Sequence, residues 1–298
     1  MEVVSPASRK ALATYLEQER EYSERGACRV AEVSRGAVRY EPKKKPEEER
    51  LRKRIRQLAR RYPRYGNARI TQQLRREDWR VNRKRVHRIR KEEGLVLPRR
   101  RPKRRRRGQP AQRLQRAEYR DHVWSYDFVE DRTEKGGRLR ILAVLDEYTR
   151  ECLALPVAPS MNAQGVTSAL EWLFMTRGVP KSIRSDNGPE FVAQAVQRWL
   201  GEQGCQTLYI EPGSPWENGF VESFIGKFRD ECLNMEIFHN GAEARTIIDA
   251  WREEYNRRRP HSALGYLTPE EFAANAVTAA SATPQQQLHH TERELILT

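Results

Sequence analysis

The chain has 298 residues, a length that corresponds to about two domains and allows at least one sizeable buried core. Its mean hydropathy is −0.88, 33% of its residues are charged, and no stretch approaches the roughly 20 apolar residues that a bilayer requires, which argues against a membrane-spanning protein. The first residues, MEVVSPASRK, lack the apolar run of a secretory signal, so a cytoplasmic location is expected.

Charge is unevenly divided along the chain. Residues 1–120 carry 39 basic and 15 acidic side chains, a net charge of +24, whereas residues 121–298 carry 17 and 26, a net charge of −9. A positive field of this size favours a polyanionic partner, and the acidic second part suits a site that binds cations. A highly charged solvated surface is the alternative, although solubility alone does not require such segregation.

Residues 1–96 predict two small helical modules. In residues 1–45, Ser23 and Ser34 are placed to cap two short helices, and the break between them resembles the turn of a helix-turn-helix. Residues 46–96 predict three helices, the last running from its cap Asn82 to Gly94. This third helix is basic outside and apolar inside, as in trihelical domains that read DNA, although a basic bundle that contacts protein has the same pattern.

A basic linker, residues 97–119, follows the trihelical module. From Arg99 to Arg107, eight of nine residues are basic, and Pro102 is the exception. Like charges at this density repel one another and favour an extended arm that becomes ordered on nucleic acid. A plain solvated linker is the alternative.

From residue 120 the pattern changes to three short apolar strands and then alternating helices and strands. This order predicts an α/β fold: a mixed five-stranded sheet with helices on both faces, in a core of residues 120–276 that includes a C-terminal helical extension. Residues 277–298 are rich in Ala, Thr and Gln and are predicted to form a loose tail.

Three acidic residues stand where a divalent metal could be held. Asp127 lies within an aromatic strand, Asp186 ends the strand KSIRSD before a turn and a helix, and Glu222 lies on the flank of an amphipathic helix. On that helix edge Asn218 and Arg229 fall within about 40° of Glu222. Structural alternatives are a turn or capping aspartate for Asp186 and an exposed helical glutamate for Glu222.

These residues carry a family resemblance. Asp127, Asp186 and Glu222, the last two separated by 35 residues, resemble the D, D-35-E triad of retroviral integrases and related bacterial transposases. The blocks WSYDF, LDEYTRE, SDNGPEF, PWENGFVESFIGKFRDE and YNRRRPHSALGYLTPEEF each resemble those of insertion-sequence transposases of the second-reading-frame type with an integrase-like core. The resemblance covers most of residues 20–275.

The resemblance implies a ribonuclease-H-like core in which the three carboxylates hold two Mg²⁺ or Mn²⁺ ions. It also implies a reaction in which the enzyme cuts phosphodiester bonds at transposon ends and joins the freed 3′-hydroxyl to DNA. Asp146 matches a recurrent acid and ranks below the triad as a further ligand, while Asn187, Gly188 and Trp216 match positions that shape the pocket. The expected DNA contacts lie on the trihelical module, the linker and the helix of Glu222: Arg83, Lys84, Arg88, Lys91, Arg104, Arg105, Arg106, Arg107, Asn218, Lys227 and Arg229.

The implied partners are transposon and target DNA, with a homo-multimer formed on DNA and a location at the nucleoid. In the resembling transposases a leucine heptad belongs to a separate upstream frame, so fusion to or pairing with an upstream-frame protein is a further expectation. Two alternatives stay open: a non-catalytic DNA-binding regulator of the element, and a purely hydrolytic nuclease of the same fold. A strand-transfer assay separates all three.

Overall fold

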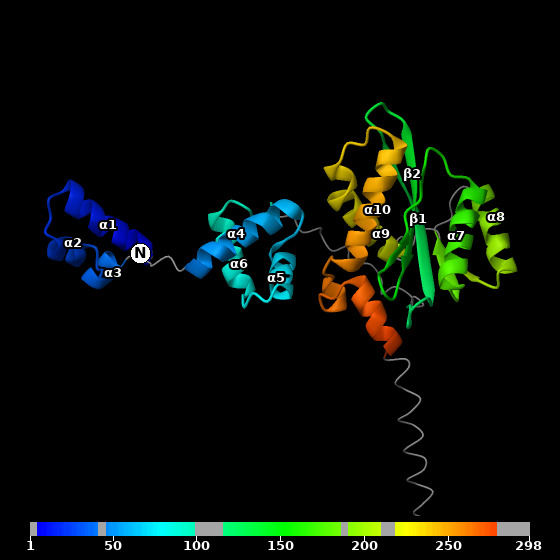
Figure 1. The fold of residues 1–298 in the computed structure, drawn as a ribbon. Coiled ribbons are helices and arrows are strands. Elements are labelled where there is room, and N and C mark those ends of the chain that lie inside the picture. The colour runs from blue at the N-terminus through cyan, green and yellow to red at the C-terminus, as the bar shows by residue number, and fades with distance from the viewer. Residues whose placement is uncertain (1–4, 41–45, 99–115, 186–189, 210–217, 279–298) are drawn as a thin grey trace, which may run out of the picture. The chain divides into compact units, whose positions relative to one another are not determined.

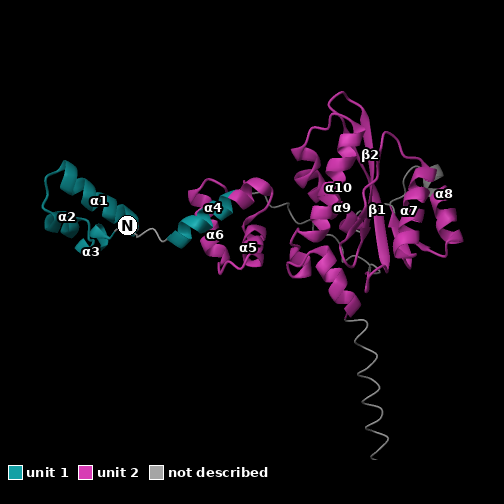
Figure 2. Ribbon diagram, in the orientation of Figure 1, with its two compact units in different colours: residues 1–56 teal, residues 57–298 magenta. Residues whose placement is uncertain are grey.

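The computed structural model describes residues 5–40, 46–98, 116–185, 190–209 and 218–278, with the backbone alone for residues 190–193 and 209. The chain forms two compact units, residues 1–56 and 57–298 (Figure 2). Within the described residues, no helix combines the length and the apolar character needed to cross a membrane.

The first unit begins with three helices, each with a serine at its N-cap. They are α1 (Pro6–Glu19), α2 (Glu24–Val30) and α3 (Arg35–Arg39). The Oγ atoms of Ser23 and Ser34 each accept a backbone N–H three residues on, at 3.2 Å, which confirms both predicted caps. Glu32 has a φ of 50° in the turn between α2 and α3. Ala13, Ala27 and Cys28 are buried where these helices pack.

Three further helices follow, and α4 extends across the boundary between the units. They are α4 (Pro46–Arg61), α5 (Asn67–Arg76) and α6 (Arg83–Glu92). Helix α6 begins as predicted, because Asn82 Oδ1 accepts the amide of Arg85 at 2.8 Å. It ends before Gly94, whose φ of 68° is a left-handed conformation that glycine adopts without strain. Val86 and Ile89 face inward and are fully buried, as the spacing predicts.

The second unit contains a mixed sheet of six strands in the order β3-β2-β1-β5-β6, with β4 also paired to β2. The strands are β1 (Val123–Arg132), β2 (Arg138–Asp146), β3 (Cys152–Ala154), β4 (Val157–Ala158), β5 (Ser182–Ser185) and β6 (Gln206–Tyr209). Strands β1, β2, β3 and β4 pair antiparallel, whereas β5 runs parallel to both β1 and β6.

The sheet confirms the predicted α/β class, with one difference. The third predicted strand is divided into β3 and β4 at Leu155 and Pro156, because proline has no N–H to donate to a ladder. The carbonyl of Pro156 still accepts the amide of Leu142 at 3.2 Å, so both pieces stay on β2.

Helices cover both faces of this sheet (Figure 1). They are α7 (Ala163–Arg177) and α8 (Glu190–Glu202) on one face, and α9 (Gly219–Glu231) and α10 (Gly241–Arg257) on the other. One apolar cluster joins the sheet to α7 and α8, and a second joins it to α9 and α10. Short 3-10 turns lie at Leu233–Met235 and Ser262–Leu264.

The last described helix, residues 269–278, begins with a reciprocal cap. Thr268 Oγ1 accepts the amide of Glu271 at 3.2 Å, and Glu271 Oε2 accepts the amide of Thr268 at 2.8 Å. This confirms the predicted cap at Thr268 with Pro269 at the first helical position.

Candidate active site

Asp127 lies on the face of the sheet that α9 covers. Side chains alternate between the two faces of a strand. On β1, Trp124 and Tyr126 belong to the cluster under α7 and α8, whereas Val129 belongs to the cluster under α9 and α10. Asp127 shares the face of Val129, is half-buried there, and has an Oδ1 that accepts the amide of Phe128 at 2.7 Å.

Strand β5 lies directly beside β1 and ends one residue before Asp186. The two strands run parallel, with Ser125 opposite Arg184. Ile183 packs in the cluster under α7 and α8, so Arg184 lies on the same face as Asp127. Asp186 itself, with Asn187, Gly188 and Trp216, lies outside the described residues, so its place in the site stays a prediction.

Glu222 is carried by α9, which packs on β1 and β2 through Val221, Phe224 and Phe228. Its neighbour Val221 is fully buried, whereas Glu222 is exposed on the flank of the packed face, as the helical spacing predicts. Thus the fold brings Asp127 and Glu222 to the same side of one sheet, from a strand and a helix that pack together.

The three other predicted residues on this helix differ in burial. Asn218, immediately before α9, is buried, and its Oδ1 has no hydrogen-bond partner among the described residues. Arg229 is exposed, two turns after Glu222. Lys227 is half-buried, and its Nζ donates to Ser223 Oγ at 2.9 Å.

Asp146 has a structural role at the end of β2. Its carboxylate accepts the backbone amides of Asp121, Tyr148 and Thr149 at 2.7 to 2.9 Å and is fully buried. Burial raises the pKa of this carboxyl, and the three amide donors oppose that rise. Because its oxygens are occupied in closing the turn to β3, Asp146 is better explained as a turn residue than as a further metal ligand.

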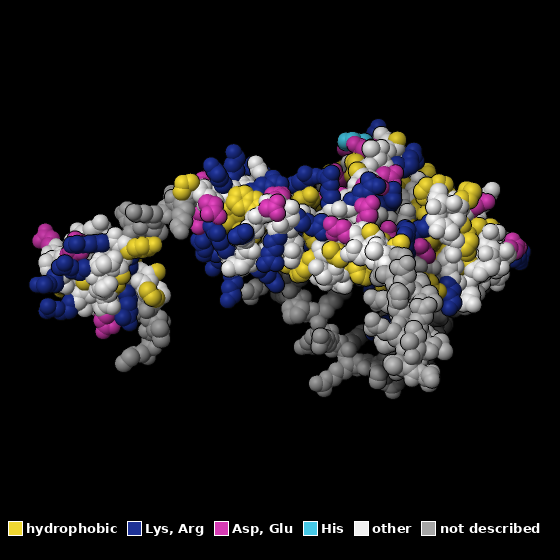
Figure 3. All heavy atoms as spheres, turned by 60° about the horizontal axis from the view of Figure 1, so that its bottom comes forward, with side chains coloured by type: hydrophobic (Ala, Val, Ile, Leu, Met, Phe, Trp, Pro, Cys, Tyr) yellow, Lys and Arg dark blue, Asp and Glu magenta, His cyan; other side chains and the backbone are white. Residues whose placement is uncertain are grey.

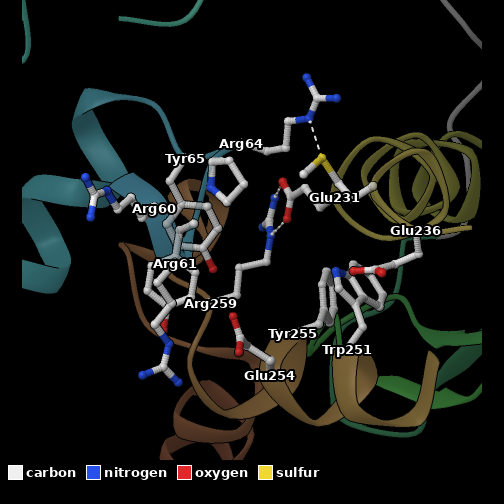
Figure 4. A pocket seen from close by; sticks show the side chains of 13 residues that line it. Arg60, Arg61, Arg64, Tyr65, Glu231, Glu236, Trp251, Glu254, Tyr255 and Arg259 are labelled. Carbon is white, nitrogen blue, oxygen red and sulfur yellow. Dashed lines mark hydrogen bonds and ion pairs between the residues drawn. The ribbon is translucent and has the colours of Figure 1, made fainter. Parts of the chain in front are cut away.

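A buried ion pair anchors the end of α9. Arg259 donates to both carboxylate oxygens of Glu231, at 2.6 and 2.7 Å (Figure 4). Arg69 of α5 donates to the same carboxylate at 2.8 Å. Glu231 and Arg259 border a cavity of about 310 Å³ that Tyr65 and Trp251 also line. The network ties the helix of Glu222 to α5 and to the C-terminal segment of the same unit.

The sequence reasoning missed Arg150, which lies in the turn between β2 and β3. Its guanidinium lies 3.7 Å from the centroid of the Phe220 ring, in the first turn of α9. The signal in the sequence was a single basic residue within LDEYTRE, between two apolar strands. That signal could not identify Arg150 as a neighbour of α9, because the contact joins residues far apart in the chain.

The predicted DNA contacts on α6 are all exposed. Figure 3 shows Lys and Arg side chains gathered over the region of α4 to α6. Arg88 also pairs with Glu92 at 3.0 Å on the same helix. The exposed cations on α6 are Arg83, Lys84, Arg88 and Lys91. Arg104, Arg105, Arg106 and Arg107 lie outside the described residues.

Within the described ranges, no group of three or more His, Cys, Asp or Glu side chains is placed to hold a metal ion. Asp186, which is required for the predicted triad, is not among them. The described part of the site therefore supplies two carboxylates, Asp127 and Glu222, of the three that the sequence predicts.

Sequence profiles of known families match the helical module and the α/β core of this chain. Two sequence profiles described as "Integrase core domain" match residues 118–215 and 203–269, and a profile described as "HTH-like domain" matches residues 46–103.

Several relatives are encoded by insertion elements. An uncharacterized 31.7 kDa protein of insertion element IS407 from Burkholderia multivorans is 41% identical over 262 residues, which are 87% of this chain and 94% of that protein. An uncharacterized 39.2 kDa protein of IS476 from Xanthomonas euvesicatoria is 40% identical over 85% of this chain and 73% of that protein. Transposase InsF of insertion sequence IS3A from Escherichia coli is 29% identical over 50% of this chain and 52% of that protein.

Solved structures of integrases also align with the chain. A simian T-cell lymphotropic virus intasome chain aligns over 74% of both chains, with 14% identity and a TM-score of 0.46. The catalytic core of BIV integrase aligns over 54% of this chain and 99% of that chain, with 20% identity and a TM-score of 0.42.

Proposed function

Because this chain belongs to the insertion-sequence transposases with an integrase core, we propose that Asp127, Asp186 and Glu222 are its catalytic carboxylates. Membership makes it a polynucleotidyl transferase of the transposase type. The proposed reaction is cleavage of phosphodiester bonds at the ends of the element, followed by transfer of the freed 3′-hydroxyl to DNA.

The observation that carries the proposal is the position of Asp127 on the sheet face against which the helix of Glu222 packs. The register of β5 supports the third carboxylate, Asp186: Ser125 of β1 lies opposite Arg184, and β5 ends at Ser185, the residue before Asp186. Parallel strands end at a common edge, where open α/β sheets bind their ligands.

The proposed triad fits a pair of divalent cations. Carboxylate oxygens are the ligands that Mg²⁺ prefers, and residues on a strand and a packed helix are fixed in position by the core. The cations, when bound, supply activation of the attacking oxygen and stabilisation of the leaving oxygen of a phosphodiester. The protein itself holds the carboxylates at one side of the sheet and positions the DNA beside them.

We propose that the exposed basic face of α6 and the linker bind DNA at the element ends. Helix α6 is the third helix of a trihelical module, the position of the helix that enters the major groove in three-helix variants of the helix-turn-helix. Its cations Arg83, Lys84, Arg88 and Lys91 project outward while Val86 and Ile89 hold it to the module. Because the proposed partner is DNA, we propose a location at the nucleoid.

The proposed assembly is a homo-multimer on DNA, with pairing or fusion to an upstream-frame protein. Two element ends must be held together for joining, which a multimer provides. Light scattering on the chain with and without end DNA tests the multimer, and co-purification with the upstream product tests the pairing.

A strand-transfer assay with labelled element ends and Mn²⁺ tests the proposed chemistry. We expect Asp127→Asn, Asp186→Asn and Glu222→Gln each to abolish cleavage and joining while DNA binding persists. Asp131→Asn is a matched control on β1, since its Oδ1 also accepts the next backbone amide, at 2.8 Å. Glu171→Gln, on exposed α7 surface, controls for loss of a helical glutamate.

The three possible outcomes are distinct. Cleavage with joining supports the transposase, and cleavage without joining indicates a hydrolytic nuclease. Binding without either reaction indicates a regulator. Full cleavage by any of the three triad variants would remove that residue from the proposed site.

A further inference from the structure

We propose that the cavity between α9 and the β2–β3 turn binds a phosphate of the DNA strand, with Arg150 and Lys227 as its ligands. The inference rests on the proposed function, because a DNA strand must reach the helix that carries Glu222. It adds to that function a second anchoring point, separate from the carboxylates.

The cavity has a volume of about 420 Å³ and lies along one edge of α9. Three cationic side chains line it: Arg150 from the β2–β3 turn, Lys227 from α9, and Arg116. Phe224 and Tyr255 supply an aromatic lining. A cavity with several cations and an apolar wall suits a phosphate that is attached to a nucleoside, because the wall can contact the sugar or base.

Arg150 is held in place without a carboxylate partner. Its φ of 64° is a left-handed conformation, and its guanidinium lies over the Phe220 ring. Burial lowers its pKa, and the fields of Glu147 and Asp146 raise it. Both carboxylates are engaged elsewhere: Asp146 by three backbone amides, and Glu147 by Arg184 at 2.9 Å. Among the described residues, none forms an ion pair with Arg150.

Lys227 likewise forms no ion pair with a carboxylate among the described residues. In the described part of the chain, the hydrogen bond of its ammonium is to the neutral Ser223 hydroxyl. Glu231 is an acid that raises the pKa of Lys227, and its carboxylate is bound by Arg259 and Arg69. Burial, Arg259, Arg69 and Arg150 together lower the pKa of Lys227 to about 8, so the side chain is a cation that lacks stabilisation.

The other titratable groups that line the cavity add no negative charge near neutral pH. Burial raises the pKa of the Tyr255 phenol, which stays protonated. Burial and nearby cations lower the pKa of His261 to about 2, which leaves the imidazole neutral. The cavity therefore holds positive charge that the described residues do not neutralise, and burying unpaired charge is costly unless an anion joins it.

The chemistry of the two cations favours a phosphate. A guanidinium offers several N–H donors in a plane and an ammonium offers a compact charge, and both are common phosphate ligands. A second cavity of about 370 Å³ shares Ser223 and Lys227 and continues along α9 to Arg64 and Arg69. Asp230 and Glu231 line it too and pair with these two arginines, so Lys227 is the cation that this cavity offers to an anion. Two adjoining cavities along α9 suit an extended strand better than an isolated anion.

The test is a scan of the end DNA with single neutral methylphosphonates, measured by fluorescence anisotropy on the full chain carrying Glu222→Gln to prevent cleavage. We expect one position at which the substitution weakens binding roughly tenfold, as loss of a charged hydrogen bond does. In a protein that also carries Arg150→Gln, the methylphosphonate at that DNA position should weaken binding little further. Arg198→Gln, exposed on α8 on the other face of the sheet, should leave the sensitivity intact.

Circular dichroism shows whether Arg150→Gln folds. If it does not, the same methylphosphonate scan is repeated with Lys227→Gln in its place. Inorganic phosphate is the second arm, followed by thermal shift. Stabilisation by phosphate that Arg150→Gln removes, without any coupled methylphosphonate position, would overturn the DNA-strand assignment in favour of a free anion. The absence of both the phosphate stabilisation and a coupled methylphosphonate position would overturn the proposed site altogether. Complete absence of DNA binding would instead reject the proposed function.

Discussion

Replacing Arg259 by glutamine tests the buried ion pair that anchors the helix of Glu222. The Arg259 side chain is 3% exposed and that of Glu231 is 8% exposed, so water screens their interaction little. Arg69, which is 26% exposed, keeps one contact with Glu231 after the substitution. Glutamine removes the buried positive charge and both of the short contacts that Arg259 makes with the carboxylate.

The expected loss can be bounded. Removing one partner of a buried pair destabilises a protein by about 3–5 kcal/mol, and the remaining Arg69 contact favours the lower end, about 3 kcal/mol. For a unit of this size a change of 1 kcal/mol moves the melting temperature by about 2–4 °C, so we expect a decrease of about 6–12 °C.

Thermal and urea unfolding measure this loss, with Arg257→Gln as the matched control. Arg257 lies two residues away, is 60% exposed and pairs with Glu253 and Glu270 on the surface, where a pair contributes at most about 1 kcal/mol. A loss for Arg259→Gln no larger than that for Arg257→Gln would refute the reasoning.

The pH dependence gives an independent check. Burial alone would raise the pKa of Glu231, but Arg259 and Arg69 outweigh it and hold the pKa below the ordinary 4.5. A depressed folded-state pKa contributes stability above the unfolded-state pKa and loses it as pH falls through the folded value. The difference between wild type and Arg259→Gln should therefore be full near neutral pH and shrink below about pH 4.5.

Three further predictions concern DNA binding and the core. Binding to duplex DNA should weaken steeply with salt, with a slope of log K against log salt of about −0.9 per neutralised phosphate; an affinity independent of salt would contradict the electrostatic interpretation. Because burial, Arg259 and Arg69 lower the pKa of Lys227 to about 8, DNA affinity should fall from pH 7 to pH 9, and Lys227→Gln should flatten that dependence in the same anisotropy titration. Arg184→Met leaves Glu147 buried without its partner and should lower the free energy of unfolding by about 3–5 kcal/mol, whereas an unchanged urea midpoint would show that the pair is dispensable.

Features that depend on neighbouring residues could be predicted from the amino-acid sequence. Asn82 and Thr268 were identified as caps because capping bonds join residues three apart. The stripe of α9 was identified because an apolar face repeats with the helical period, and the aromatic alternation around Asp127 marked a strand with a carboxylate inside it. The division of the third strand at Pro156 was not predicted, because the effect of this proline on the ladder depends on β2, the partner strand.

Tertiary structure alone decided which charged groups are buried and what they contact. Glu231 and Arg259 are of residue types that are usually exposed, yet packing buries them beside Arg69 from a helix that is distant in the sequence. Asp146 matched a recurrent acid of the resembling transposases, and the backbone amides around it explain it better as a turn residue. The physical reason is that local periodicity fixes the direction of a side chain along its own element. The solvation of a charge and its partners depend on segments that meet only after the chain has folded.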